Sequence, residues 1–185
     1  MASGFDFKRI QRELHSLLND PPPSCSAALA DDGNFLHLSA TIKGPPDSPY
    51  EGGEFHLSIE LINYPVNPPY VTFRTLVYHP NISFLGSVCL GILSNEWSPD
   101  YTIGQVLLTI YCLLMDPNYD DPWSQDVGKL YKENREKYYA TAREWTQKYA
   151  IPPDIEVILP AIEPDTKPAP SSWKRNNRKN CCTIS

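Results

Sequence analysis

A cysteine in a long irregular stretch is the residue best suited to covalent chemistry in this 185-residue sequence. Cys89 lies between Leu76 and Glu96, where apolar residues follow neither a helical nor an alternating period. Such a stretch inside a compact domain is more often functional than structural. A thiol is suited to acyl carriage, because a thioester keeps the acyl carbon activated and its sulfur leaves readily. Taken alone, a cysteine is more often a buried apolar residue, and we keep that interpretation for Cys25 and Cys112.

Length and composition indicate one domain with an appendage. Hydrophobic residues make up 41% of the chain, and its 19 prolines cluster instead of being spread evenly. Residues 1–150 carry 11 Lys and Arg against 18 Asp and Glu, whereas residues 151–185 carry five against four. An acidic domain without a basic stripe argues against nucleic acid as a partner, because such binding depends on neutralising phosphates.

The periodicity of apolar residues predicts helices at both ends of a group of strands. A first helix is expected over about residues 5–19, ended by Asp20 and three prolines. Strands are expected near residues 24–30, 35–42, 54–61 and 70–74, and later helices over residues 103–115, 124–133 and 134–149. Helices that follow strands without alternating with them indicate an α+β fold, here a four-stranded antiparallel meander. The prolines after Ile151 predict that the domain covers residues 1–150 and that residues 151–185 form a flexible tail.

Short motifs in a fixed order resemble a known family. They are His79-Pro80-Asn81, Gly86-Ser87-Val88-Cys89-Leu90, Trp97-Ser98-Pro99, Tyr50-Glu51-Gly52-Gly53, Tyr64-Pro65 and Asp120-Asp121-Pro122. In order and spacing they resemble the signature of ubiquitin-conjugating enzymes, over about residues 5–150. The segment 144–149 is similar to the closing helix of the broadly acting subfamily.

The resemblance implies a four-stranded antiparallel sheet packed with four helices, which agrees with the periodicity. It also implies an activity: Cys89 accepts ubiquitin from an activating enzyme as a thioester and, with a ligase, passes it to lysines of protein substrates. No metal or other cofactor is expected.

Roles for individual site residues follow from the same resemblance. The side-chain amide of Asn81 is the candidate donor to the oxyanion, a contribution of about 2.7–4 kcal/mol; alternatively it holds the loop by bonding to backbone groups. Asp121 is expected across the cleft from Cys89, where it would orient the incoming amine and accept its proton, unless it is only a turn residue. His79 is expected to fix the loop, not to act as a base, and Asn118 to shape the same wall.

Residues on the first helix and a later loop are candidates for partner binding. Lys8, Arg9 and Arg12 form a basic edge that by resemblance meets the activating enzyme. Lys8, Ser98 and Pro99 would meet ligases. Without the resemblance, these charges would be interpreted as a solvated helix face.

Ser26 matches a position where some relatives bind a second ubiquitin on the sheet surface. Two residues depart from the family pattern. Gly91 stands where many close relatives carry an acid two residues after the cysteine, and Val66 stands where the subfamily places a large aromatic side chain. The missing acid at Gly91 puts one electrostatic contribution to the reaction in doubt. The missing ring at Val66 puts the binding of ligases that need it in doubt.

The C-terminus ends in a motif that directs prenylation. Cys182-Thr183-Ile184-Ser185 has the C-a-a-X form, with farnesyl as the expected lipid. Cys181 is a candidate for palmitoylation, and four basic residues lie upstream, at positions 174, 175, 178 and 179. With no signal peptide near Met1, we expect a cytoplasmic protein attached peripherally to the cytosolic face of a membrane. The alternative is an exposed, inert tail.

Three other functions remain open. A cysteine isopeptidase would also form a thioester with ubiquitin, but it needs a histidine base beside the thiol, and the sequence marks none. A ubiquitin-binding scaffold without catalysis would lack the cysteine. The modifier carried on Cys89 could instead be a ubiquitin-like protein.

Overall fold

The computed structural model describes residues 6–151 of the chain. The predicted tail and its lipidation candidates Cys181 and Cys182 lie outside these residues. The elements are α1 (Phe7–Asn19), β1 (Cys25–Leu29), β2 (His37–Lys43), β3 (Glu54–Glu60), β4 (Tyr70–Phe73), the short 3₁₀ turn η1 (Gly91–Leu93), α2 (Ile103–Met115), α3 (Gln125–Glu133) and α4 (Arg135–Tyr149). The strands pair in the order β1-β2-β3-β4, each antiparallel to the next. The predicted α+β class and the meander are confirmed.

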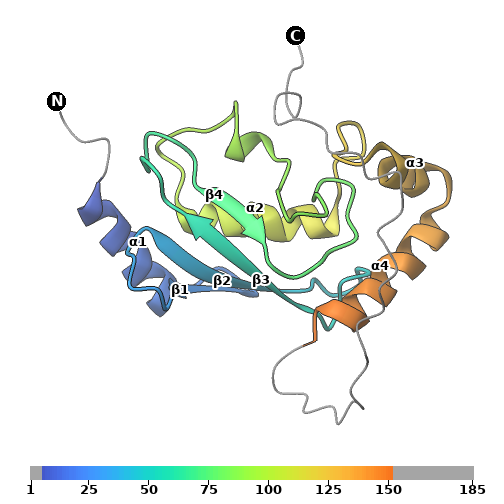
Figure 1. Cartoon of the computed structure of the whole chain (residues 1–185), viewed down its shortest axis with the longest axis horizontal. Coiled ribbons are helices and arrows are strands. Elements are labelled where there is room, and N and C mark those ends of the chain that lie inside the picture. The colour runs from blue at the N-terminus through green and yellow to red at the C-terminus, as the bar shows by residue number, and fades with distance from the viewer. Residues whose placement is uncertain (1–5, 152–185) are drawn as a thin grey trace.

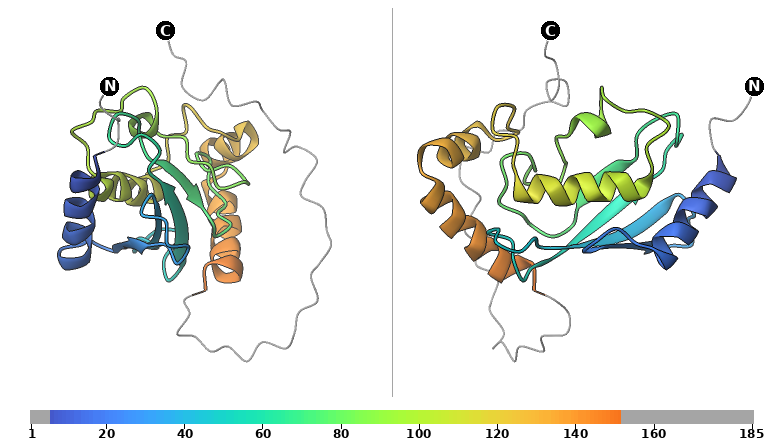
Figure 2. Two further views of the ribbon diagram at one scale, coloured as in Figure 1. Left: turned by 60° about the vertical axis from the view of Figure 1, so that its left-hand side comes forward. Right: turned by 180° about the vertical axis from the view of Figure 1, so that it is seen from behind.

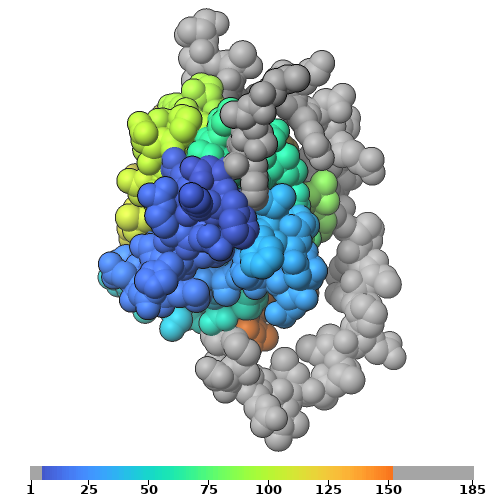
Figure 3. Space-filling model, turned by 90° about the vertical axis from the view of Figure 1, so that its left-hand side faces the viewer, coloured from blue at the N-terminus to red at the C-terminus, as the bar shows by residue number. Residues whose placement is uncertain are grey.

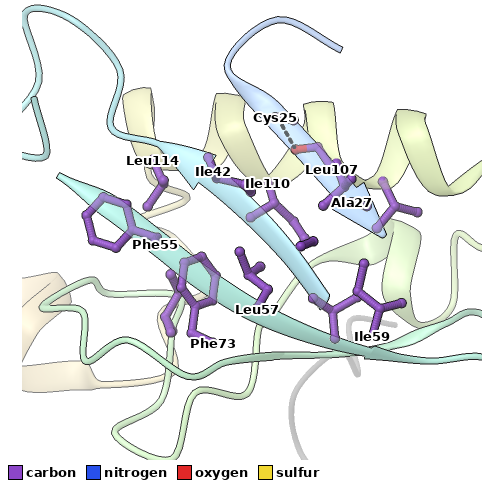
Figure 4. Close-up of a cluster of buried hydrophobic side chains, with 14 of the residues drawn as sticks. Cys25, Ala27, Ile42, Phe55, Leu57, Ile59, Phe73, Leu107, Ile110 and Leu114 are labelled. Carbon is purple, nitrogen blue, oxygen red and sulfur yellow. Dashed lines mark hydrogen bonds between the residues drawn. The ribbon is translucent and has the colours of Figure 1, made fainter. Parts of the chain in front are cut away.

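The helices cover the sheet unevenly (Figures 1 and 2). Helix α2 lies along one face of the sheet, α1 packs beside β1, and α3 and α4 gather at the opposite end of the molecule. Between α2 and the strands lies the core, in which Phe55 and Leu57 of β3 share a cluster with Ile110 and Leu114 of α2 (Figure 4). The buried and exposed residues of β2 and β3 alternate, so the other face of the sheet meets solvent.

Side-chain caps mark the starts of α1, α2 and α4. Thr102 and Gln105 form a reciprocal capping box at the start of α2. The side chain of Asp6 accepts the backbone N–H of Arg9 at 3.0 Å in α1, and Asn134 caps α4 in the same way. These caps satisfy N–H groups that have no partner within the helix.

Strand β2 begins two residues later than expected, at His37 and not at residue 35. The side chain of Asn34 accepts the backbone N–H of Leu36 at 3.0 Å, and its carbonyl accepts that of His37 at 2.9 Å. Phe35 is held in this turn and stacks edge to face on Phe7, outside the ladder. The turn therefore uses backbone donors that the strand would need.

The two cysteines expected in the core differ. Cys25 is buried, its thiol donates to the carbonyl of Leu107 at 3.9 Å, and burial raises its pKa to about 11. Cys112 is exposed, so the expectation of a buried residue is wrong there. The sheet-facing side of α2 is filled by Val106, Leu107, Ile110, Leu113 and Leu114, which leaves Cys112 on the opposite side. No helix within residues 6–151 is long and apolar enough to cross a bilayer.

Candidate functional site

Backbone hydrogen bonds place Cys89 beside the His79-Pro80-Asn81 motif. The N–H of Cys89 donates to the carbonyl of Asn81 at 2.8 Å, and Ile82 forms an isolated antiparallel bridge with Val88. The turn between them contains Gly86 at φ +85°, where a Cβ would run into a backbone carbonyl of β4. A glycine there lets the loop close tightly, and the closed loop brings Asn81 and Cys89 together.

His79 is fixed under this loop by both ring nitrogens. Its Nε2 lies 2.9 Å from the carbonyl of Leu113, and its Nδ1 lies 3.0 Å from the backbone nitrogen of Asn81. Because a backbone N–H can only donate, Nδ1 is the acceptor and Nε2 carries the hydrogen. Complete burial lowers the pKa of His79 to about 4, so the ring is neutral near pH 7. With both nitrogens engaged, His79 has no lone pair left to take a proton from a substrate.

The side-chain amide of Asn81 joins two segments. Its Nδ2 donates to the carbonyl of Asn118 at 2.7 Å and to that of Asp121 at 3.2 Å, and the side chain is fully buried. The Oδ1 atom is buried and has no hydrogen-bond partner within residues 6–151. Exchanging the two amide atoms would set an oxygen against two carbonyl oxygens, which fixes the orientation. Both amide hydrogens are therefore used in holding the 118–121 loop, and donation to an oxyanion stays a prediction.

Asp121 and Asn118 reach the site through these contacts. The side chain of Asp121 is half-buried, and within residues 6–151 no hydrogen bond or ion pair engages its carboxylate. Its neighbour Asp120 differs, because Lys132 Nζ lies 2.9 Å from the Asp120 carboxylate. Asn118 also accepts the backbone N–H of Asp120 on its side chain at 3.2 Å. The structure thus brings Cys89, Asn81, Asn118 and Asp121 into one chain of contacts.

A second polar cluster, partly buried, lies under α1, and no sequence pattern predicted it. The carboxylate of Glu13 accepts Arg9 Nε at 2.7 Å, the hydroxyl of Tyr64 at 2.8 Å and the backbone N–H of Ile103 at 2.8 Å. Arg9 also donates to the carbonyl of Tyr101 at 2.7 Å. Only the i,i+4 spacing of Arg9 and Glu13 was visible in the sequence. Arg9, predicted as part of a binding edge, is thus engaged within the molecule.

The other residues predicted to bind partners lie at one end of the molecule. Lys8 and Arg12 are exposed on α1, and Val66 is 61% exposed in a neighbouring loop. The indole N–H of Trp97 donates to the carbonyl of Pro65 at 2.9 Å, which ties that loop to the one containing Ser98 and Pro99. The yellow-green loop near residue 100 lies next to α1 in Figure 3.

Ser26 lies elsewhere, on the exposed face of the sheet. It pairs with Thr41, which in turn pairs with His56, so the three side chains form a row across β1, β2 and β3. Cys25 and Ala27 on either side of it are buried, which directs Ser26 away from the core.

The fold and the geometry of the cysteine loop agree with a comparison to protein families. A family model described as ubiquitin-conjugating enzyme matches residues 9–146, most of the chain. The chain therefore belongs to the ubiquitin-conjugating enzyme family, and ubiquitin conjugation is its general activity. Members of this family generally act together with ubiquitin, an activating enzyme and ligases. Within residues 6–151 no three or more His, Cys, Asp or Glu side chains gather as a metal site would need.

Proposed function

We propose that this enzyme accepts ubiquitin from an activating enzyme as a thioester on Cys89 and passes it, with a ligase, to substrate lysines. The observation that supports this most directly is the double attachment of Asn81. Its carbonyl binds the N–H of Cys89, and its amide binds the loop that carries Asp121. One residue thus joins the backbone of the nucleophile to the loop that carries Asp121, whose carboxylate has no hydrogen-bond or ion-pair partner among residues 6–151.

Two balanced steps follow. In loading, the Cys89 sulfur attacks the thioester on the activating enzyme, one C–S bond forms, another breaks, and the departing thiolate takes the proton that Cys89 loses. In transfer, the lysine ammonium loses a proton and its nitrogen attacks the carbonyl. The C–S bond to Cys89 then breaks, and the nitrogen loses a second proton, which neutralises the Cys89 thiolate. Deprotonating lysine at pH 7 costs about 4.6 kcal/mol, from a pKa of about 10.4. Asp121 orients the amine and accepts its first proton.

Asn81 contributes in two ways. It holds the site together before reaction, and it donates to the oxyanion that develops during attack. Of the two hydrogen bonds that its amide donates, the one to Asp121 is the longer at 3.2 Å. This bond is the one that breaks when the amide donates to the oxyanion instead. One such donor is worth about 2.7–4 kcal/mol of barrier.

A charging reaction tests this proposal. With activating enzyme, ATP and ubiquitin, the chain should give a shifted band on a non-reducing gel that thiol reductant removes. Cys89→Ser should give a reductant-resistant oxyester and Cys89→Ala no adduct, with the exposed Cys112→Ser as a matched control that charges normally.

Parallel reactions with ubiquitin-like modifiers decide which protein is carried. An adduct formed without activating enzyme would indicate an isopeptidase, and a chain that never charges would be a binding scaffold. An unchanged adduct in Cys89→Ala would exclude Cys89 as the carrier.

Membrane attachment is the second part of the proposal and rests on the sequence of the tail. A farnesyl group on Cys182 gives only marginal binding, since one myristoyl chain binds with a constant of about 10⁴ M⁻¹. The four basic residues upstream add roughly 1 kcal/mol each near an anionic leaflet, about a thousandfold together. Palmitoylation of Cys181 would be a further signal.

Cell fractionation tests the attachment. The full chain should sediment with membranes, and both Cys182→Ser and a farnesyltransferase inhibitor should release it. Cys181→Ser separates the contribution of the second lipid. Charging of Cys89 should stay the same in every variant, and a parent chain that is equally soluble would refute the anchor.

A further inference from the structure

The chain folds back on itself immediately after the nucleophile. Gly91 is two residues beyond Cys89 and opens η1, the lime-green turn above α2 in Figure 1. The carbonyl of Gly91 accepts the backbone N–H of Ser94 at 2.9 Å and that of Glu96 at 3.0 Å. These two bonds return the backbone of Glu96 to the start of the turn.

The side chain of Glu96 fills the place of a side chain at residue 91. A Cβ on Gly91 would overlap the Glu96 carboxylate and lie 3.0 Å from its Cγ. The backbone itself does not require glycine there, because the glycines with positive φ are Gly33, Gly52 and Gly86. What glycine supplies at residue 91 is room for the carboxylate.

This carboxylate is available to an incoming cation. Glu96 is exposed, and no hydrogen bond or ion pair engages its carboxylate within residues 6–151. The Cα atoms of Cys89 and Gly91 are at most about 7 Å apart, as two residues of extended chain allow. A negative charge at the position of residue 91 therefore acts on an ammonium approaching a thioester on Cys89.

We infer that Glu96 is a positioning residue for the acceptor: its carboxylate, which lies beside Gly91, draws the lysine ammonium toward the thioester on Cys89. The inference deepens the proposed function and rests on it. Glu96 acts on the lysine ammonium through its negative charge and takes no proton in the transfer step. Many close relatives carry an acid at the position of Gly91. In this chain the carboxylate comes instead from Glu96, five positions further along.

Four variants of the full chain test this. Glu96→Gln keeps the shape and removes the charge, whereas Gly91→Ala keeps the charge and displaces it. Each should raise the lysine concentration for half-maximal discharge about three- to tenfold, as expected for one charge near the surface. The double variant should lose no more than either single one, because both remove the same effect. Gly91→Asp in the Glu96→Gln background should restore the parent behaviour.

Three controls separate charge from damage to the fold. Discharge to hydroxylamine, a neutral nucleophile, should be unchanged in Glu96→Gln. The lysine effect should shrink in high salt. Charging with ubiquitin should proceed normally in all four variants, which shows that the thioester itself forms.

The outcomes are distinct. If the parent never charges, the proposed function fails and this inference fails with it. If every variant charges but Glu96→Gln discharges to lysine like the parent, or loses lysine and hydroxylamine reactivity equally, only the role of Glu96 is refuted. Additive losses in the double variant would likewise refute it, because the two changes would then act separately.

Discussion

Two polar clusters, one fully buried and one partly buried, hold segments of this enzyme together, and they are built differently. The thiol-loop cluster, His79 and Asn81, is neutral and fully buried beneath Cys89. The α1 cluster, Arg9, Glu13 and Tyr64, contains an ion pair at the end of the molecule that carries the predicted partner-binding residues. Burial raises the pKa of Tyr64, which keeps its hydroxyl protonated as a donor to Glu13.

The difference teaches where charge can be placed in such a molecule. Neutral groups hold the cysteine loop without adding a fixed charge beside Cys89, and in the proposed transfer this would leave the charge of the nearby carboxylates free to act on the acceptor amine. The ion pair stays partly hydrated, with 19% of the Arg9 side chain and 10% of the Glu13 side chain exposed, which limits its desolvation cost. Each cluster joins segments far apart in sequence, and breaking each should affect a different property.

Removing the acceptor of the α1 cluster should have the largest effect on stability. Glu13→Ala leaves Tyr64, Arg9 and the N–H of Ile103 without their shared partner, and should cost about 3 kcal/mol of unfolding free energy. Urea unfolding measures this. Glu13→Gln, which keeps one acceptor oxygen but removes the charge, should lose less; an equal loss would mean that the remaining acceptor oxygen contributes nothing to stability. Folded Glu13→Ala should still discharge to free lysine normally.

The thiol-loop cluster should make stability depend on pH. The pKa of His79 is depressed to about 4 from an ordinary 6.5, so its contribution is complete above pH 6.5 and is lost as the pH falls toward 4. This lowering of the pKa corresponds to about 3 kcal/mol. Urea unfolding of the parent and of His79→Gln at several pH values gives the slopes. The parent should lose more free energy over this window, and parallel slopes would contradict the buried neutral state.

Asn81→Ala should separate the two steps of the reaction. The variant should still charge, because Cys89 retains its backbone bond to residue 81, but discharge to free lysine should slow at least tenfold (about 1.4 kcal/mol) as the donor is lost. Single-turnover discharge of the pre-charged enzyme measures this. Equal loss of charging and discharge would reduce Asn81 to a purely structural residue.

Asp121→Asn should also slow discharge to lysine, about tenfold, because the acceptor of the amine proton is lost. Its rate should rise more steeply with pH than that of the parent, since solvent base replaces the carboxylate. Asp120→Asn is a matched control, because that carboxylate is paired with Lys132 and should not affect discharge. The same pH profile in Asp121→Asn and the parent would count against a role for Asp121.

The smallest effect is expected on the exposed charges of α1. Lys8→Ala and Arg12→Ala should each slow charging about two- to fivefold at low salt, and less at high salt, because rim charges act mainly on association. Initial charging rates at two ionic strengths measure this. Discharge of the pre-charged enzyme to lysine should not change; if it does, these residues act at the reaction site.

Local patterns predicted most of the fold. The predicted helix and strand boundaries agree with the observed ones within two residues. Apolar periodicity and proline stops are local signals, and the meander follows from short connections between consecutive strands. The late start of β2 at His37 was missed because it depends on the side chain of Asn34.

The contacts that assemble the site could not be predicted in the same way. Asn81 meets residues 118 and 121, and Glu13 meets Tyr64 and Ile103, across 37 to 90 positions of sequence. No spacing rule links residues so far apart. The family motifs predicted Asn81 and Asp121 as site residues. Glu13 belongs to none of these motifs, and only the three-dimensional structure shows that Glu96 lies beside Gly91.

The most direct test of the central claim is intact-mass spectrometry of a single turnover. The chain is charged with ubiquitin, the activating enzyme is inhibited so that it cannot recharge the chain, and lysine is then added. We predict that the chain first gains the mass of one ubiquitin less one water, located on Cys89 by peptide mapping, and then returns to its starting mass while a ubiquitin–lysine amide forms. A gain that persists after lysine, or that maps to a residue other than Cys89, would contradict the account.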